Sequence, residues 1–156
     1  MLDMTEITNR LIFHEGLSLM PYKDSQGLTT IGVGRCVETN PFTSEELKAV
    51  GDWKHGITRN AALYLLRNDV KKVYHSLKKE IEFFKDLDSE RQYALLDMGF
   101  NLGVSGLLRF KKMINALKYK DFNTAATECL DSKYALTVKT RAHRIAETLR
   151  TGIFKK

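Results

Sequence analysis

The chain has 156 residues, 43% of them hydrophobic, and a formal net charge of +6. This length fits one domain with a hydrophobic core. No stretch is apolar for long enough to span a membrane, and the N-terminal residues lack the basic region and apolar run of a secretory signal. The positive charge favours an anionic partner, such as nucleic acid, a membrane surface or a bacterial envelope; otherwise it only keeps the surface soluble.

The first predicted element is a helix over residues 5–15, which Gly16 is expected to end. Ile7, Leu11 and Glu15 recur at intervals of four and predict one buried stripe. A carboxyl group there loses hydration and lies beside the negative end of the helix dipole, and both effects favour its protonated form at neutral pH. Glu15 is therefore a candidate general acid, although an acidic residue near a helix end is, by itself, usually just solvated.

A β-hairpin is predicted next, with a turn at Asp24–Gly27 and a strand over Leu28–Gly34. One face of this strand suits a core, and it carries Thr29, Ile31 and Val33. The other face is nearly without side chains, and it carries Thr30, Gly32 and Gly34. The glycines either bend the strand or leave room for a flat ligand, which makes Gly34 a candidate substrate-binding residue.

The loop length decides which residues of the hairpin face each other. A three-residue loop at 25–27 places Tyr22 opposite Thr30, and Asp24 becomes a diagonal neighbour of Thr30, roughly 7 Å away. A four-residue loop breaks this parity, and the sequence leaves both open. Asp24 lies in a turn open to water, so we expect it to be ionised. A protonated carboxyl group beside an ionised one suits a general acid that works with a base, a nucleophile or a stabilising charge. Taken separately, Asp24 could instead cap its own turn, and Thr30 could be present because threonine favours β-strands.

The rest of the chain is predicted to be helical, which gives an α+β, mostly helical fold. Helices are expected over residues 43–51, 58–79, 89–103, 107–117, 122–130 and 138–149. Capping boxes are predicted at Thr43 with Glu46 and at Ser89 with Gln92. The two cysteines lack metal-ligand spacing, so we expect reduced thiols, no metal and no cofactor.

A set of motifs now points to a known family. The motifs are His14-Glu15-Gly16-Leu17, Tyr22-Lys23-Asp24, Gly27, Thr30-Ile31-Gly32-Val33-Gly34, Asn68-Asp69-Val70, Asp97-Met98-Gly99-Phe100-Asn101-Leu102-Gly103, Arg141-Ala142, Arg144 and Arg150-Thr151-Gly152. In this order, over nearly the whole chain, they closely resemble the lysozymes of T-even-type phages, a muramidase family of glycoside hydrolases.

This resemblance implies a lysozyme-like fold and a reaction. The fold would have a small α+β lobe at about 14–60 and a helical lobe at 80–156 plus 1–13, joined by the helix at 58–79. The reaction would be hydrolysis of the β-1,4 link from N-acetylmuramic acid to N-acetylglucosamine in peptidoglycan. By position, Glu15 resembles the general acid, Asp24 the second carboxylate and Thr30 the hydroxyl partner in the cleft.

Other positions carry weaker expectations. Phe100 resembles an aromatic residue at the cleft edge, or it belongs to the core of its helix. Arg141 is a candidate ion-pair partner of Glu15, or it is a surface arginine. The family more often has a histidine where this chain has Arg35, and we predict that Arg35 pairs with Asp69 on the apolar row of the long helix.

Two further cleft positions of the family align with Met113 and Glu128, which do not match the family pattern. Sugar contacts at these two positions therefore cannot be carried over from the resemblance.

The expected protein is a monomeric endolysin that acts on peptidoglycan within the anionic bacterial envelope, without nucleic acid and without stable membrane insertion. It would be made in the cytoplasm of the host bacterium and would reach the wall after another factor opens the inner membrane. One alternative is a basic helical nucleic-acid-binding module, for which Lys71-Lys72 and Lys78-Lys79 are the nearest basic pairs. Others are a catalytically inactive wall-binding protein on the same scaffold and a tail-associated lysozyme, although the latter usually belongs to a larger chain.

Overall fold

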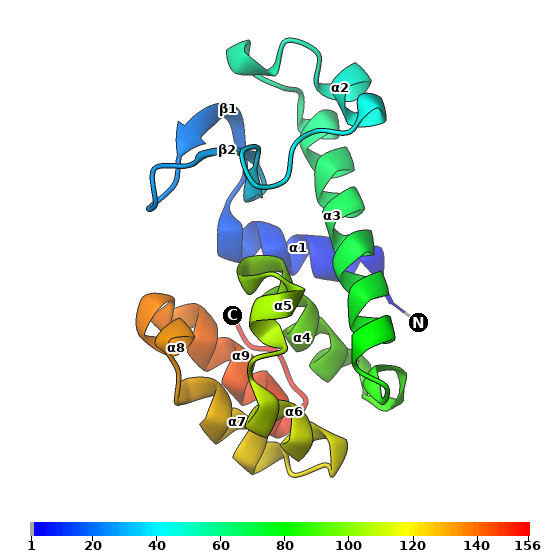
Figure 1. The fold of residues 1–156 in the computed structure, drawn as a ribbon, viewed down its shortest axis with the longest axis vertical. Coiled ribbons are helices and arrows are strands. Elements are labelled where there is room, and N and C mark those ends of the chain that lie inside the picture. Colours follow the sequence, from blue (N-terminus) through cyan, green and yellow to red (C-terminus); the bar gives the residue numbers. More distant parts are fainter. Residues whose placement is uncertain (1) are drawn as a thin grey trace. The chain divides into compact units, whose positions relative to one another are not determined.

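A computed structural model describes residues 2–156 and has the predicted α+β, mostly helical class (Figure 1). The chain divides into two compact units, Asp3–Lys71 and Lys72–Lys156, the second of which also includes Leu2. We call them the α+β unit and the helical unit. The boundary falls inside the long helix α3 (Arg59–Glu80). Residues 3–13 group with the α+β unit, whereas the resemblance to T-even-type phage lysozymes implied a helical lobe that includes residues 1–13.

The α+β unit contains two helices, three short strands and the first half of α3. In chain order these are α1 (Met4–Glu15), β1 (Ser18–Lys23), β2 (Thr29–Gly32), β3 (Arg35–Cys36), α2 (Ser44–Val50) and a 3-10 turn at Trp53–His55. Helix α1 begins after Asp3, whose side chain accepts hydrogen bonds from the N–H groups of Thr5 and Glu6. It ends at Gly16, as predicted.

The three strands form an antiparallel sheet in the order β1-β2-β3. Tyr22 pairs with Thr30, and the Asp24 N–H donates to the Leu28 carbonyl over 2.9 Å. These pairs confirm the three-residue hairpin loop and its register.

Strand β2 ends at Gly32 rather than at Gly34, because Gly32 has a φ of +68° and leaves the extended conformation. A Cβ at Gly32 would lie 3.7 Å from the Cβ of Ala62 in α3, which is an ordinary contact distance, so the positive φ explains this glycine better than a lack of space does. Because Gly32 is buried, the bend in the strand, and not an open face for a ligand, is the alternative that fits this position. Strand β3 was not predicted.

The core of the α+β unit lies between the sheet and α3. Its buried members are Ile31, Val50, Ile57, Ala61, Ala62 and Leu65, and Phe42 and Trp53 pack against them edge to face. Thr30, next to Ile31, is also buried. The middle of β2 is thus covered on both faces, which the simple alternation of core and open residues did not predict.

The helical unit contains the second half of α3 and a bundle of mostly short helices. These are a 3-10 turn at Phe84–Asp86, α4 (Ser89–Leu102), α5 (Val104–Leu107), α6 (Lys111–Lys118), α7 (Phe122–Leu130), α8 (Lys133–Thr137) and α9 (Lys139–Thr151). Helix α7 packs against both α6 and α9, and α4 packs against α9 (Figure 1). The single helix predicted at 107–117 is two helices, α5 and α6.

The ends of the helices in this unit are fixed by side chains. Asp88, and not the predicted Ser89, caps α4 and accepts the N–H of Arg91. Arg91 in turn donates to the carbonyls of Leu149 and Arg150 over 2.7 and 3.1 Å, which ties the end of α9 to the start of α4. Helix α9 ends before Gly152, as predicted.

The core of the helical unit requires close approach of its helices. A Cβ at Gly99 would lie 3.0 Å from Cγ1 of Val73, so glycine lets α4 pack directly on α3. Cys129 is fully buried, and burial raises the pKa of its thiol to about 12. None of the helices that the structure describes is long and apolar enough to cross a membrane.

Candidate active site

Glu15 is the last residue of α1, and its carboxyl group lies beside a glycine. Ile7 and Leu11 are buried as predicted, but Glu15 is half-buried, because the helix ends there and the chain turns away at Gly16. A Cβ at Gly34 would lie 3.1 Å from both Cδ and Oε1 of Glu15. A larger residue at position 34 would therefore press on this carboxyl group, and the φ of +66° at Gly34 also favours glycine.

Asp24 is held by its own turn. Its Oδ1 accepts hydrogen bonds from the backbone N–H groups of Gln26 and Leu28, over 2.8 and 2.9 Å. Its carbonyl accepts the N–H of Gly27. The side chain therefore caps the turn, as an aspartate in this position often does. Because both bonds go to Oδ1, the turn fixes the orientation of the carboxyl group without using Oδ2.

Thr30 lies opposite Tyr22 and is 4% exposed. Its Oγ1 donates to the Leu28 carbonyl over 3.2 Å. The hydroxyl proton is thereby committed, and the oxygen can act toward a ligand or a water molecule only as an acceptor.

Tyr22 connects the two carboxyl groups. The pKa of its phenol is raised, first by burial and then by the negative charges of Glu15 and Asp24. Both carboxyl groups therefore lie within electrostatic reach of the same hydroxyl. Glu15 lies at a helix end, Asp24 in a turn and Thr30 in a strand. The charges of both carboxyl groups nevertheless act on Tyr22, and Thr30 pairs with Tyr22 across the strands.

A buried cluster around Arg35 lies next to this site in the chain, because Arg35 follows Gly34. The predicted ion pair is present, with Arg35 Nη1 at 3.1 Å from Asp69 Oδ1. A second carboxylate, Glu46, was not predicted and binds both terminal nitrogens of Arg35, the shorter contact being 2.7 Å. Arg35 Nε donates to the Asn40 carbonyl over 2.7 Å. The cluster fixes the chain on both sides of β3.

Glu46 also completes the predicted capping box with Thr43. Burial by itself would raise the pKa of Glu46, but hydrogen bonds from Arg35, Asn68 and the Thr43 N–H, together with the charge of Arg35, lower it to about 2. The carboxylate is thus ionised at all ordinary pH values. The capping motif was visible in the sequence, but its burial against an arginine was not.

The other predicted site residues lie in the helical unit. Phe100 is half-buried in α4. Arg141 donates from Nε to Asp97 Oδ1 over 2.7 Å, and both side chains are buried. The predicted pairing of Arg141 with Glu15 joins two units and stays a prediction. Asp97 was not proposed as a partner, although it belongs to one of the resembling blocks.

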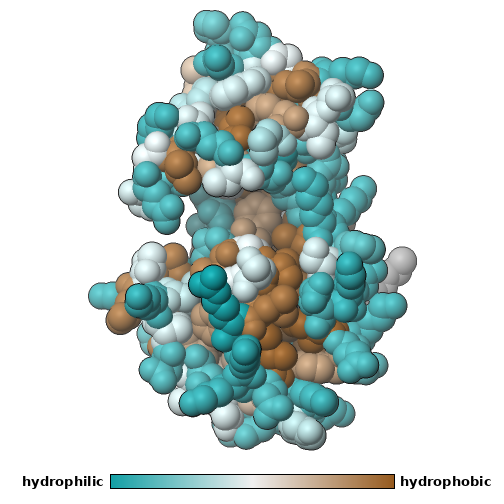
Figure 2. Space-filling view, in the orientation of Figure 1, coloured by the Kyte–Doolittle hydropathy of each residue, from teal (hydrophilic) through white to brown (hydrophobic). Residues whose placement is uncertain are grey.

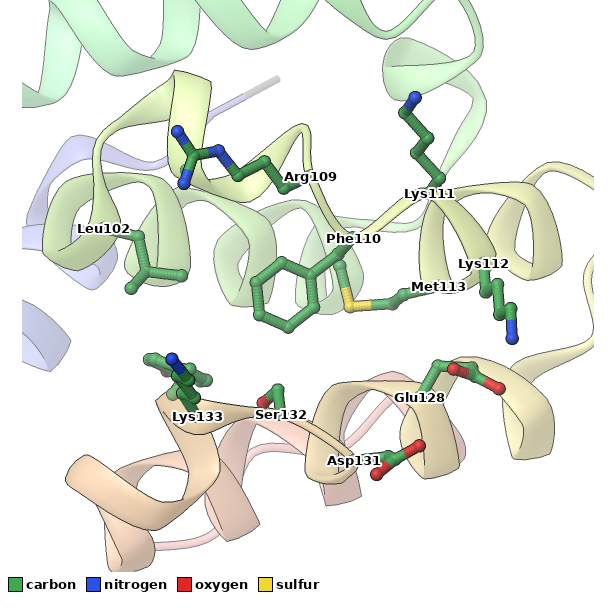
Figure 3. A pocket seen from close by; sticks show the side chains of 12 residues that line it. Leu102, Arg109, Phe110, Lys111, Lys112, Met113, Glu128, Asp131, Ser132 and Lys133 are labelled. Carbon is green, nitrogen blue, oxygen red and sulfur yellow. The ribbon is translucent and has the colours of Figure 1, made fainter.

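The helical unit also has a pocket of about 620 Å³. Its wall includes Met113 and Glu128, the two residues that align with cleft positions of the family but do not match its pattern. Figure 3 shows Phe110 and Met113 near its centre, with Glu128 on the side of α7. Four basic side chains and two carboxyl groups line it: Arg109, Lys111, Lys112, Lys133, Glu128 and Asp131. On the face shown in Figure 2, hydrophobic residues gather over α5 and are bordered by hydrophilic ones. The pocket combines an apolar floor with charges of both signs.

No group of three or more histidine, cysteine or acidic side chains in the described range 2–156 could hold a metal ion.

Comparison with known proteins identifies the family. The profile of the family described as "Phage lysozyme" matches residues 13–145, and the chain belongs to this family. It is 26% identical to "Probable T4-type lysozyme 2" of Dictyostelium discoideum over 98% of both chains. It is 27% identical to "Probable T4-type lysozyme 1" of the same organism, over 96% of both chains. It is 29% identical to "Pre-baseplate central spike protein Gp5" of Enterobacteria phage T4, over 97% of this chain and 28% of that protein.

These comparisons support a T4-type phage lysozyme and a muramidase-type, glycoside hydrolase function for the chain. Such a function also points to peptidoglycan as the substrate.

Proposed function

We propose that the protein is a bacteriolytic muramidase of the endolysin type, which hydrolyses the β-1,4 bond from N-acetylmuramic acid to N-acetylglucosamine in peptidoglycan. Glu15 is the general acid, Asp24 is the second carboxylate, and Thr30 helps to position the attacking water. The observation that carries this proposal is that Glu15 and Asp24, from a helix end and a hairpin turn, act electrostatically on the same phenol. Two carboxyl groups in different surroundings can divide the acid and base roles.

Glu15 supplies the proton. As the glycosidic bond breaks, the carboxyl group protonates the leaving oxygen, and a positioned general acid accelerates such a step by about 10²- to 10⁴-fold. Its position between the end of α1 and Gly34 restricts the directions in which the side chain can point. This restriction supports delivery of the proton to one defined atom.

Asp24 and Thr30 act on the other side of the sugar. The carboxylate stabilises the positive charge that grows on the ring, and its Oδ2 is directed by the two hydrogen bonds that hold Oδ1. Because Thr30 Oγ1 donates to Leu28, it accepts a hydrogen bond from a water molecule and leaves a lone pair of that water for attack. Both groups suit a water molecule held for nucleophilic attack.

The stereochemical outcome depends on how far apart the two carboxyl groups are. A separation of about 6.5–9.5 Å leaves room for water and inverts the anomeric centre, whereas about 5–5.5 Å allows direct attack by Asp24 and retention. The resemblance to T-even-type phage lysozymes favours inversion, and we propose that outcome.

At the cellular level we propose a monomer that is made in the cytoplasm of the host bacterium and meets the wall once another factor opens the inner membrane. The net charge of +6 attracts it to the polyanionic envelope and speeds encounter with the substrate.

The test is the clearing of purified cell walls by wild-type protein, Glu15→Gln and Asp24→Asn. Glu15→Gln should clear walls at least about 100-fold more slowly, because the amide cannot deliver the proton. Asp24→Asn should also be slow, yet fold normally, since its amide oxygen still accepts the N–H groups of Gln26 and Leu28. Glu45→Gln removes an exposed carboxyl group of the same unit and should leave the rate unchanged.

Three outcomes would contradict the proposal. Wild-type protein that pellets with the walls without clearing them would indicate an inactive wall-binding protein. Protein that ignores walls and shifts nucleic acid in a gel would favour the nucleic-acid-binding alternative. Glu15→Gln with wild-type activity would remove Glu15 from the reaction.

A further inference from the structure

Tyr22 occupies the centre of the site but has no role in the proposed mechanism. It lies two residues before Asp24 on β1, so their side chains point to the same face of the hairpin. It also pairs directly with Thr30 across the strands. Its side chain is 39% exposed, so the phenol is open to solvent or to a ligand. Tyr22 thus shares one face with the two groups that would hold the attacking water.

The phenol is an available donor. Within the α+β unit, Glu15 from α1 and Asp24 from the turn are the charged groups that act on it, and both disfavour the phenolate. Lys23 points to the opposite face and donates to Thr29 Oγ1 over 2.7 Å. No hydrogen bond engages the Tyr22 hydroxyl within residues 3–71. A neutral O–H group therefore stands beside a carboxylate that has used only one of its two oxygens.

We propose that Tyr22 is a positioning residue, whose hydroxyl donates a hydrogen bond to the Asp24 carboxylate when the sugar binds and so directs that carboxylate toward the sugar ring. This inference rests on the proposed function. The turn already fixes Oδ1 through Gln26 and Leu28. A third donor at Oδ2, rigidly attached to the paired strand, completes the orientation of the carboxylate.

Tyr22→Phe isolates the hydroxyl, because it keeps the ring. The loss of one hydrogen bond to a charged group should lower kcat by about ten- to a hundredfold and leave KM nearly unchanged. Tyr64→Phe is the matched control, because Tyr64 is similarly exposed (37%) in the same unit, and it should behave like the wild type.

A double-mutant cycle tests whether Tyr22 acts through Asp24. If it does, Tyr22→Phe should cost almost nothing further in an Asp24→Asn background. A loss that stays the same in both backgrounds would overturn the proposal, as would a change in KM alone. So would full activity of Tyr22→Phe combined with inactivity of Tyr22→Leu, because that result would assign the role to the ring.

A measurement without catalysis separates this inference from the proposed function. The alkaline absorbance titration of the wild type minus that of Tyr22→Phe gives the phenol's own transition. That transition should move to lower pH in Asp24→Asn, because a negative charge beside the phenol is lost. An unmoved transition would refute the contact between the two side chains, whatever the protein does to cell walls. A wild type without muramidase activity, in contrast, would refute the proposed function.

Discussion

Glu46 offers a direct test of how the α+β unit is stabilised. Its pKa is about 2 in the folded protein, against an ordinary value of 4.5. At about 1.4 kcal/mol for each pH unit, this difference corresponds to about 3 kcal/mol of stabilisation from the ionised form. Because the folded pKa is the lower one, the stabilisation is complete above about pH 5. It is lost as the pH falls through 2, and about 2 kcal/mol of it is gone by pH 3.

The perturbation is Glu46→Gln, and the assay is urea unfolding followed by far-ultraviolet circular dichroism at pH 7, 5 and 3. The difference in unfolding free energy between wild type and variant should shrink by about 2 kcal/mol between pH 5 and pH 3. The effect of the amide on packing is the same at every pH, and the other carboxyl groups titrate in the same way in both proteins. Both effects therefore cancel in this difference.

Glu45→Gln is the control from the same helix. Glu45 is exposed and faces Lys48 at 3.5 Å, so its removal should change stability by less than about 1 kcal/mol at every pH. Parallel pH curves for the wild type and Glu46→Gln would show that the buried cluster around Arg35 does not hold the carboxylate as described.

Three further predictions concern the site, the helical unit and the surface charge. Gly34→Ala should abolish most of the lytic activity, because the new methyl group would press on the carboxyl group of the general acid. Gly27→Ala is the control, since Gly27 also has a positive φ but a methyl group there would meet no atom within 4 Å. This variant should keep its activity and lose only about 1–3 kcal/mol of stability. Asp97→Asn should cost about 3–5 kcal/mol in thermal or urea unfolding, since it removes the negative charge beside the buried Arg141. Glu147→Gln at an exposed ion pair should change stability far less, and equal losses would contradict the burial argument. Wall clearing should slow as salt rises above about 0.1 M, where charges are screened within about 10 Å, and rates indifferent to salt would remove electrostatic attraction from the account.

The sequence predicted the parts of the site that depend on local rules. Gly16 ends α1 because glycine readily adopts the positive φ that this residue has. The three-residue loop places Tyr22 opposite Thr30. The pairing of Arg35 with Asp69 could also be predicted, since a charged residue on an apolar helix row requires a partner.

Other features depend on contacts between distant residues, which no periodicity reveals. Glu46 already had a local role in its capping box, so nothing in the pattern indicated a second role beside Arg35. Residues 107–117 keep a helical apolar spacing across the break between α5 and α6, because both helices bury residues in the same core. Tyr22 reads as an ordinary strand residue until the folded hairpin and α1 bring two carboxyl groups to it.

The most direct test of the central claim is analysis of the ends that the protein creates in purified peptidoglycan. After digestion, the fragments are reduced with borohydride and examined by mass spectrometry. The account predicts new reducing ends on N-acetylmuramic acid with the wild type and at least about 100-fold fewer with Glu15→Gln at equal protein and time. New reducing ends on N-acetylglucosamine, or equal yields from the two proteins, would contradict it.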